Sequence, residues 1–275
     1  MQKQKRMALV NDISGFGRCS ITVELPLVSA LKVQGCVLPT AILSVHTAFP
    51  SFYLDDYTPH MTPFIENWKQ NHVEFDGILT GFFGSLDQIA IVEKFIQDFK
   101  RKDTLAFIDP VMGDGGKLYS SYTPAMANAM RGLLPVADLI TPNLTEACNL
   151  LSEDYPTETL TNAELFEMAA ALSMKGPKEV IITGVEDGKG NLRNIVYVRG
   201  EKPQALLTPK IGGDRHGTGD VFAPIVAASR LRGENVFQAT NKAAAFIDKT
   251  IRYTDSLDIP WREGLAFEEF MTELR

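Results

Sequence analysis

The chain has 275 residues, of which 45% are hydrophobic and 22% are charged, as is usual for soluble globular proteins. This length can bury one large core and no Ser/Gly/Pro-rich linker interrupts it, so we predict a single domain over residues 1–275. Acidic residues outnumber basic ones by 34 to 27, and the net charge of −7 argues against nucleic acid as a partner.

The ends and the cysteines restrict the class of protein further. The first six residues are basic, but the apolar run after them, residues 7–10, is far too short for a signal peptide or a membrane anchor. Cys19, Cys36 and Cys148 are widely spaced and form no C-x-x-C motif, which argues against a zinc site and a disulfide framework. We therefore expect a cytoplasmic protein with no membrane partner.

Short apolar runs alternate with amphipathic segments along the chain. The runs predict strands at residues 7–10, 37–43, 77–80, 104–108, 137–140 and 179–183. Apolar residues spaced by three and four predict helices at residues 20–33, 86–100, 122–133 and 163–174. Because the strands are apolar throughout, the order predicts an α/β fold: a three-layer αβα sandwich around a mostly parallel sheet. Residues 191–199 and 204–208 predict a small antiparallel hairpin at one edge.

Polar residues closely follow four of the predicted strands. They are Asp12, Asp109, Asn143 and Thr183. In an open α/β sheet, ligands bind beyond the carboxyl ends of the strands. The fold should therefore gather these four side chains at one edge.

The motif Gly217-Thr218-Gly219-Asp220 precedes an apolar run that predicts a helix. Its glycines allow successive N–H groups to point at one spot, which makes an anion site at the start of that helix. Pro224 belongs in a first turn, so the helix should begin no earlier than about Gly219 or Asp220. A carboxylate beside an anion site indicates group transfer, with Asp220 as the general base. The alternative is a turn in which Asp220 only caps the helix.

Other nucleotide-binding motifs are absent. No G-x-x-x-x-G-K-[ST] string occurs, which argues against a P-loop protein. Gly15-Phe16-Gly17 follows the first strand, but the third glycine of a dinucleotide-binding fingerprint is missing.

Two further motifs precede the glycine loop: D-P-V-x-G-D at residues 109–114 and T-P-N-x-x-E at residues 141–146. In this order, the three motifs resemble those of ribokinase-like kinases, in particular the pyridoxal/pyridoxamine/pyridoxine (vitamin B6) kinase group. Hydroxymethylpyrimidine kinases are near relatives and the main alternative. The resemblance implies ATP-dependent phosphorylation of a hydroxymethyl group, with Mg²⁺ as cofactor, and a homodimer. It does not decide whether a monovalent cation is required or which acceptor is preferred. A catalytically idle binding protein of this fold is the non-enzyme alternative.

The resemblance also implies roles for individual residues. Gly217, Thr218 and Gly219 would form the anion hole beside the base Asp220, and Asp114 and Glu146 would serve the metal. ATP would contact Asp109, Asn143, Thr183 and Arg215, and the acceptor would contact Asp12, Leu43, His46, Thr47 and Phe82.

Several of these roles have structural alternatives. Glu146 could instead be a first-turn charge that stabilises a helix after Asn143, and His46 could be a packing residue. Asp12 stands where pyridoxal kinases typically carry serine, and Phe82 where tyrosine is common. An ionised Asp12 would favour a cationic acceptor, or it would only cap the turn at Gly15.

Overall fold

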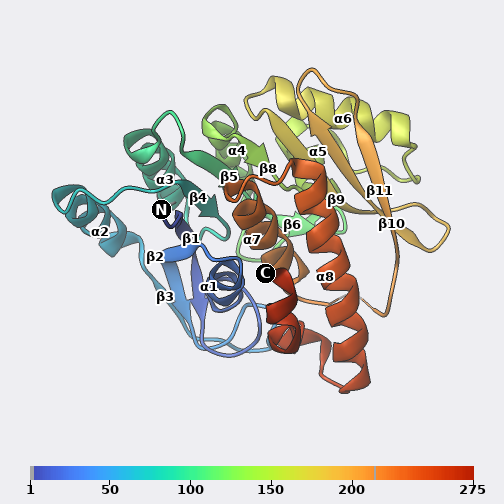
Figure 1. The fold of residues 1–275 in the computed structure, drawn as a ribbon, viewed down its shortest axis with the longest axis horizontal. Coiled ribbons are helices and arrows are strands. Elements are labelled where there is room, and N and C mark those ends of the chain that lie inside the picture. Colours follow the sequence, from blue (N-terminus) through green and yellow to red (C-terminus); the bar gives the residue numbers. More distant parts are fainter. Residues whose placement is uncertain (1–2, 214) are drawn as a thin grey trace.

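The computed structural model describes residues 3–213 and 215–275. Its central sheet consists of nine strands (Figure 1). They are β1 (Arg6–Ser14), β2 (Gln34–Leu43), β3 (Leu54–Asp56), β4 (Gly77–Thr80), β5 (Leu105–Ile108), β8 (Leu139–Ile140), β9 (Glu179–Glu186), β10 (Asn191–Val198) and β11 (Gln204–Pro209).

The strand order is β11-β10-β9-β8-β5-β4-β1-β2-β3. From β9 to β2 every neighbouring pair is parallel, whereas β3 and the β10–β11 hairpin are antiparallel and lie at the two edges. A separate two-stranded ribbon pairs β6 (Gly113–Asp114) with β7 (Lys117–Leu118). The predicted mostly parallel sheet and its edge hairpin are confirmed.

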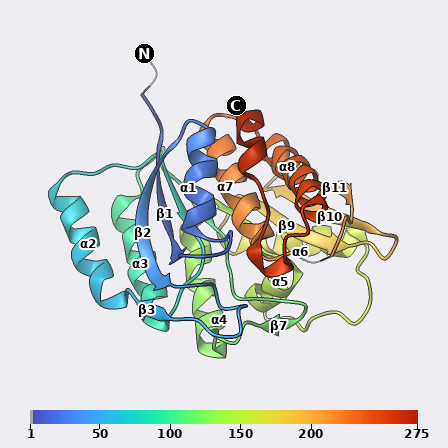
Figure 2. The same cartoon turned by 90° about the horizontal axis from the view of Figure 1, so that it is seen from below.

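Helices cover both faces of the sheet (Figure 2). One face packs against α1 (Ile21–Ala30), α7 (Thr218–Leu231) and α8 (Val236–Ser256). The other packs against α2 (Thr58–Gln70), α3 (Leu86–Phe99), α4 (Pro124–Met130), α5 (Leu144–Leu151) and α6 (Asn162–Met174). Three short 3₁₀ helices, Arg131–Val136, Trp261–Glu263 and Glu268–Leu274, complete the described elements.

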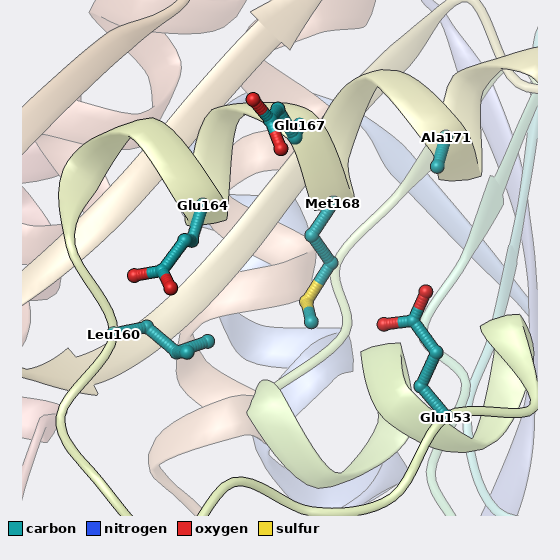
Figure 3. Close-up of a pocket in the computed structure, with 6 residues that line it drawn as sticks. All are labelled: Glu153, Leu160, Glu164, Glu167, Met168 and Ala171. Carbon is teal, nitrogen blue, oxygen red and sulfur yellow. The ribbon is translucent and has the colours of Figure 1, made fainter.

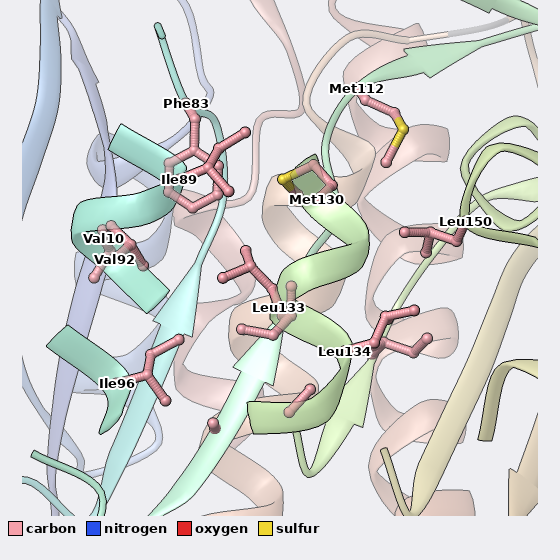
Figure 4. Packing of buried hydrophobic residues seen from close by; sticks show 14 of the residues in the cluster. Val10, Phe83, Ile89, Val92, Ile96, Met112, Met130, Leu133, Leu134 and Leu150 are labelled. Atoms are coloured by element: carbon pink, nitrogen blue, oxygen red, sulfur yellow. The ribbon is translucent and has the colours of Figure 1, made fainter. Parts of the chain in front are cut away.

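The strand β1 shows why two cores form. Met7 and Leu9 belong to the cluster on the α1/α7/α8 side, whereas Ala8 and Val10 belong to the opposite cluster. Successive side chains of a strand point to opposite faces, so an apolar strand serves both layers. Figure 4 shows part of this opposite cluster, whose members include Val10 of β1, Ile89 and Val92 of α3, and Met130 of α4.

The sequence predicted some boundaries well and missed some elements. All six predicted strands and all four predicted helices are present, although β8 is only two residues long. The helix after the glycine loop begins at Thr218, so the expected later start is wrong. Pro224 therefore lies beyond the first turn, where its missing N–H leaves one helical hydrogen bond unmade. The sequence did not predict β3, α2, α5 or α8.

No helix among the described residues is long and apolar enough to cross a membrane.

Candidate active site

The carboxyl ends of the parallel strands bring the predicted polar residues to one edge of the sheet. Asp109 follows β5, and its Oδ1 accepts a hydrogen bond of 2.9 Å from the Thr141 hydroxyl, which follows β8. Asn143 and Thr183 form an isolated parallel bridge where β8 and β9 diverge. The sheet therefore aligns the predicted nucleotide-binding residues Asp109, Asn143 and Thr183 along neighbouring strands.

The glycine loop enters α7 by a conformation that only glycine adopts easily. Gly217 is the N-cap and has a φ of 77°, in the left-handed region. A Cβ on Gly217 would also lie 2.3 Å from the carbonyl oxygen of Arg18, so a side chain is excluded twice. No side chain of the described residues caps α7. The N–H groups of its first turn, which have no partner inside the helix, are therefore available to an anion.

Asp109 faces this helix start from the sheet. Its Oδ2 would lie 3.9 Å from a Cβ placed on Gly219. A phosphate seated on the α7 amides would consequently be close to the Asp109 carboxylate. A divalent cation between the two anions would remove the repulsion between them.

Asp220 lies in the first turn of α7 and is half-buried. Burial raises its pKa to about 7, and the negative charges of Asp12 and Asp109 act in the same direction. Hydrogen bonds from the Ser20 backbone and the Asn11 side chain lower the pKa in part. A carboxylate with a pKa near neutrality can both accept and release a proton at working pH, as a general base must.

Asp12 braces the loop between β1 and α1. Its Oδ1 accepts a 2.6 Å hydrogen bond from the Ser20 hydroxyl, and its Oδ2 accepts one of 2.9 Å from the Ser14 hydroxyl. Burial raises the pKa of Asp12, while these two hydroxyls and the charge of His46 lower it. The carboxylate therefore has a structural role. The lone pairs that remain on its oxygens can still accept a hydrogen bond from a substrate that is phosphorylated.

His46 is buried between the loop that contains Gly17 and the segment that contains Arg262. Its Nδ1 accepts a hydrogen bond from the Ala48 N–H at 3.3 Å, so Nε2 carries the proton and donates to the carbonyl of Arg262 at 2.6 Å. Gly17 lies against the ring, because a Cβ there would be 2.8 Å from His46 Cδ2. The packing role considered for His46 is therefore present in the structure.

The other residues predicted to bind the acceptor substrate lie at the ends of β2 and β4 or just after them. The Leu43 carbonyl accepts from the Gly15 N–H at 2.8 Å, and Thr47 is next to His46 in the loop after β2. Phe82 is half-buried, and its ring meets that of Tyr122 edge-on with centroids 6.5 Å apart.

Asn143 and Glu146 form a capping box at the start of α5. Asn143 Oδ1 accepts from the Glu146 N–H at 3.0 Å, and Glu146 Oε2 accepts from the Asn143 N–H at 2.8 Å. Glu146 Oε1 also accepts from the Met112 N–H at 3.1 Å. The structural alternative considered for Glu146 is thus realised, and both carboxylate oxygens hold backbone in place.

Two further carboxyl groups, those of Asp109 and Asp114, act electrostatically on Glu146. Burial raises its pKa well above the ordinary value, and the charges of Asp109 and Asp114 raise it further. No three His, Cys, Asp or Glu side chains are placed to hold a metal ion within residues 3–213 and 215–275. This donor set suits Mg²⁺ that is held mainly by substrate phosphates and water, with one or two carboxylates beside it.

Arg215 is hydrogen-bonded to the end of α8 and to the segment that follows it. Its Nε and Nη2 donate to Asp255 Oδ1 at 2.9 and 2.5 Å, and its Nη1 donates to the Ile259 carbonyl at 2.9 Å. To contact a nucleotide, the guanidinium would have to leave Asp255.

Two buried polar residues that act on the base electrostatically or by hydrogen bonding were not singled out in the sequence. Asn11 is buried one residue before Asp12, and Glu24 is buried in the first turn of α1. Polar residues at apolar-pattern positions are a weak signal, because such positions also occur at ordinary satisfied sites in cores. His216 lies in the glycine loop, where its ring stacks on His46.

A comparison with protein families resolves the assignment of the chain. The model of the family described as phosphomethylpyrimidine kinase matches residues 21–262. The chain belongs to this family. The resemblance to ribokinase-like vitamin kinases that the three motifs indicated is confirmed.

The names of two curated relatives of this chain refer to different vitamins. The thiamine biosynthetic bifunctional enzyme TH1 of Arabidopsis thaliana is 28% identical over 255 residues, covering 90% of this chain and 46% of the plant protein. The pyridoxine kinase of Bacillus subtilis is 33% identical over 179 residues, covering 64% of each chain. This chain thus spans less than two thirds of the length of these curated relatives.

Among solved structures, a Bacteroides thetaiotaomicron protein provisionally called a phosphomethylpyrimidine kinase, with pyridoxal in its crystal, is 41% identical. The TM-score is 0.95, and the match covers 99% of this chain and 96% of that chain.

A pocket also lies outside the candidate site. It is lined by residues of α6 and by Glu153 and Leu160, and three glutamates surround it (Figure 3). One of them, Glu164, forms a capping box with Thr161 at the start of α6. The pocket offers an anion no positive side chain, so it plays no part in the chemistry derived below.

Proposed function

We propose that this chain is an ATP-dependent kinase that phosphorylates the hydroxymethyl group of a vitamin B6 vitamer, with Asp220 as the general base. The observation that carries the proposal is the position of Asp220. It lies at the uncapped start of α7, and burial raises its pKa to about 7. A base is thus adjacent to amides suited to an anion, which is the arrangement that phosphoryl transfer requires.

In this mechanism the Asp220 carboxylate accepts the proton of the acceptor hydroxyl. The hydroxyl oxygen forms a bond to the γ-phosphorus of ATP, and the bond between that phosphorus and the β–γ bridging oxygen breaks, so that ADP leaves with the electron pair. The N–H groups of Gly217, Thr218 and Gly219 would stabilise the charge on the transferred group. Since little covalent chemistry falls to the protein, positioning and electrostatic stabilisation supply most of the rate.

Asn143 and Thr183 would lie along the nucleotide, with Asp109 near its phosphates and Arg215 as a further contact after it leaves Asp255. Asp114 and Glu146 would serve Mg²⁺ through its water shell, because both Glu146 oxygens already accept backbone N–H groups. When bound, Mg²⁺ neutralises charge on the phosphates. Burial raises the pKa of Glu146 and the charges of Asp109 and Asp114 raise it further, and this repulsion between carboxylates supports a cation at this place.

Asp12, Leu43, His46, Thr47 and Phe82 would line the acceptor site. Support for a B6 vitamer comes from the Bacteroides relative, whose crystal contains pyridoxal, and from the B. subtilis relative named a pyridoxine kinase. Hydroxymethylpyrimidine is the second candidate acceptor, because the family and the Arabidopsis relative are named for thiamine-related chemistry. Both acceptors are flat nitrogenous rings that carry a hydroxymethyl group.

The deciding experiment compares turnover of pyridoxal, pyridoxamine, pyridoxine and hydroxymethylpyrimidine by the purified chain with ATP and Mg²⁺. We expect the highest specificity constant for a B6 vitamer. A higher value for hydroxymethylpyrimidine would reassign the acceptor, and ligand binding without ADP formation on any acceptor would indicate an idle binding protein. Repeating the assay with Na⁺ or K⁺ as the added monovalent cation tests whether one is required.

The same proposal includes a single domain over residues 1–275 and a cytoplasmic location, as the sequence indicates, and a homodimer, as the resemblance implies. Light scattering of the purified chain measures the oligomeric state.

A further inference from the structure

Asn11 is the side chain that connects the base to the walls of the acceptor site. It is buried on β1, and its Oδ1 accepts two backbone hydrogen bonds, from the Asp12 N–H at 2.9 Å and the Phe82 N–H at 2.8 Å. These two donors identify which amide atom is Oδ1, because the reverse assignment would set N–H groups against N–H groups.

The NH₂ group of Asn11 therefore points away from these donors. Nδ2 donates to Glu24 Oε1 at 2.9 Å. The Asn11 side chain also lowers the pKa of Asp220 by hydrogen bonding. Gly81 makes room for this arrangement, since a Cβ there would lie 2.3 Å from Asn11 Nδ2. One amide thus links Glu24 to the backbone of Asp12 and Phe82, and it also acts on the pKa of the base.

Glu24 is a buried carboxyl group to which the mechanism gives no role. It is 2% exposed in the first turn of α1, and its Oε2 has no hydrogen-bond partner among the described residues. Taking an ionised carboxylate out of water without a partner is strongly unfavourable. Burial raises its pKa well above the ordinary value, and the negative charges of Asp220 on α7, Asp109 after β5 and Asp12 on β1 raise it further.

We propose that Glu24 is a positioning residue: as a neutral carboxylic acid it accepts the Asn11 hydrogen bond and thereby fixes the amide that orients Asp220 and the backbone of Asp12 and Phe82. The neutral form suits Oε1, which acts as the acceptor for Asn11, and it avoids an unpartnered negative charge at the buried Oε2. This role rests on the kinase function proposed above. It predicts that kcat depends on a hydrogen-bond acceptor at residue 24 and does not depend on a negative charge there.

Two substitutions separate these properties. Glu24→Gln keeps a neutral acceptor of nearly the same shape, so we expect kcat within about threefold of the wild type. Glu24→Met keeps the volume but removes the acceptor, so the Asn11 amide loses its anchor. We expect kcat to fall by about 10- to 100-fold, as small displacements of reacting groups do, while KM for ATP stays the same.

The pH profile distinguishes positioning from a general loss of structure. The Asn11 hydrogen bond lowers the pKa of Asp220, so weakening it in Glu24→Met should shift the acid limb of kcat/KM to higher pH. Glu24→Gln should leave the limb in place. Val28→Ala is the matched control: it removes buried volume from the same helix on the apolar side, and it should lower the melting temperature without moving the limb.

Infrared difference spectroscopy tests the protonation of Glu24 without any turnover. A protonated carboxyl has a carbonyl stretching band distinct from that of a carboxylate, and this band should disappear in Glu24→Gln at neutral pH. Unchanged kcat in Glu24→Met, an equal loss of kcat in both variants, or an unchanged infrared band would each overturn the proposal. Absence of turnover by the wild type on every acceptor would instead contradict the proposed function, and the infrared result would still decide the state of Glu24.

Discussion

The imidazole rings of His46 and His216 are stacked, with centroids 3.8 Å apart and planes 10° apart. His46 lies in the loop after β2, and His216 lies in the glycine loop that leads into α7. The segment before the C-terminus supports both residues. The Arg262 carbonyl accepts a hydrogen bond from the His46 ring, and the Trp261 carbonyl accepts one from the backbone N–H of His216 at 3.3 Å. The stack therefore joins the proposed acceptor side of the site to the anion hole.

Removing this ring pair should weaken acceptor binding. An aromatic pair contributes about 0.5–1.5 kcal/mol beyond burial, so His216→Ala should raise the acceptor KM by up to about tenfold. His216→Phe preserves a flat ring and should retain most of the affinity. Steady-state kinetics with varied acceptor measures the effect, and identical KM values for all three proteins would show that the stack has no influence on the acceptor.

The same pair should make stability depend on pH. Burial and the neighbouring charge of His46 lower the pKa of His216 to about 4 from an ordinary 6.5. Between these values the unfolded chain binds more protons than the folded one, so stability should be complete above pH 6.5 and decline as the pH falls towards 4. Melting curves of the wild type and His216→Phe from pH 4 to 8 measure this, and the difference in melting temperature between them should change only in that window.

Asp220→Asn should lower kcat by about 10²- to 10⁴-fold and leave the nucleotide dissociation constant nearly unchanged, because a base acts in the transition state. In the wild type, kcat/KM should fall as the pH drops below about 7, where Asp220 becomes protonated. Undiminished turnover in the variant would remove Asp220 from the mechanism.

Stability provides the control for this substitution. The raised pKa of Asp220 means that the folded chain binds its proton more tightly than the unfolded chain does, so the wild type should lose stability as the pH rises from about 4 to 7. Asp220→Asn lacks this loss and should melt at a higher temperature than the wild type at pH 8. A lower melting temperature at pH 8 would mean that its inactivity reflects damage to the fold.

Asp12→Ser should change the preference among vitamers. A charge-assisted hydrogen bond contributes about 1.5–3 kcal/mol against about 1 for a neutral one, so pyridoxamine should lose about tenfold in specificity constant relative to pyridoxal. Ser14→Ala is the matched control, since it removes one hydroxyl that braces Asp12 and keeps the carboxylate. If both variants slow all vitamers equally, Asp12 supports the loop and does not contact the acceptor.

Glu146→Gln should affect both the metal and the fold. The two oxygens of Glu146 accept N–H groups of Met112 and Asn143, and a glutamine NH₂ would face one of these donors. We expect a loss of about 1–3 kcal/mol in unfolding free energy, together with a higher Mg²⁺ concentration at half-maximal rate. Melting curves and Mg²⁺ titrations measure the two effects. An unchanged Mg²⁺ requirement with the stability loss would leave Glu146 with its capping role alone.

The sequence by itself determined the layers of the fold and predicted the chemistry at the glycine loop. The local pattern was enough to predict the six strands. A short run that is apolar throughout fits a strand whose two faces are both covered by helices. The glycines at 217 and 219 and the carboxylate at 220 are adjacent in the chain, so an anion site with a base beside it could be predicted from neighbouring residues alone.

Only the tertiary structure decided how that site is supported. The His46 contact with Arg262 spans 216 residues, and the Asn11 contact with Phe82 spans 71. Glu146 could be a metal ligand or a helix cap in the sequence, and the Met112 N–H, supplied by another loop, shows that its carboxylate holds the backbone. Glu24 has no distinguishing motif, since its significance depends on the three carboxylates that folding brings around it. A local pattern specifies which groups are present, but long-range packing sets their hydrogen bonds and burial, and these determine their pKa values.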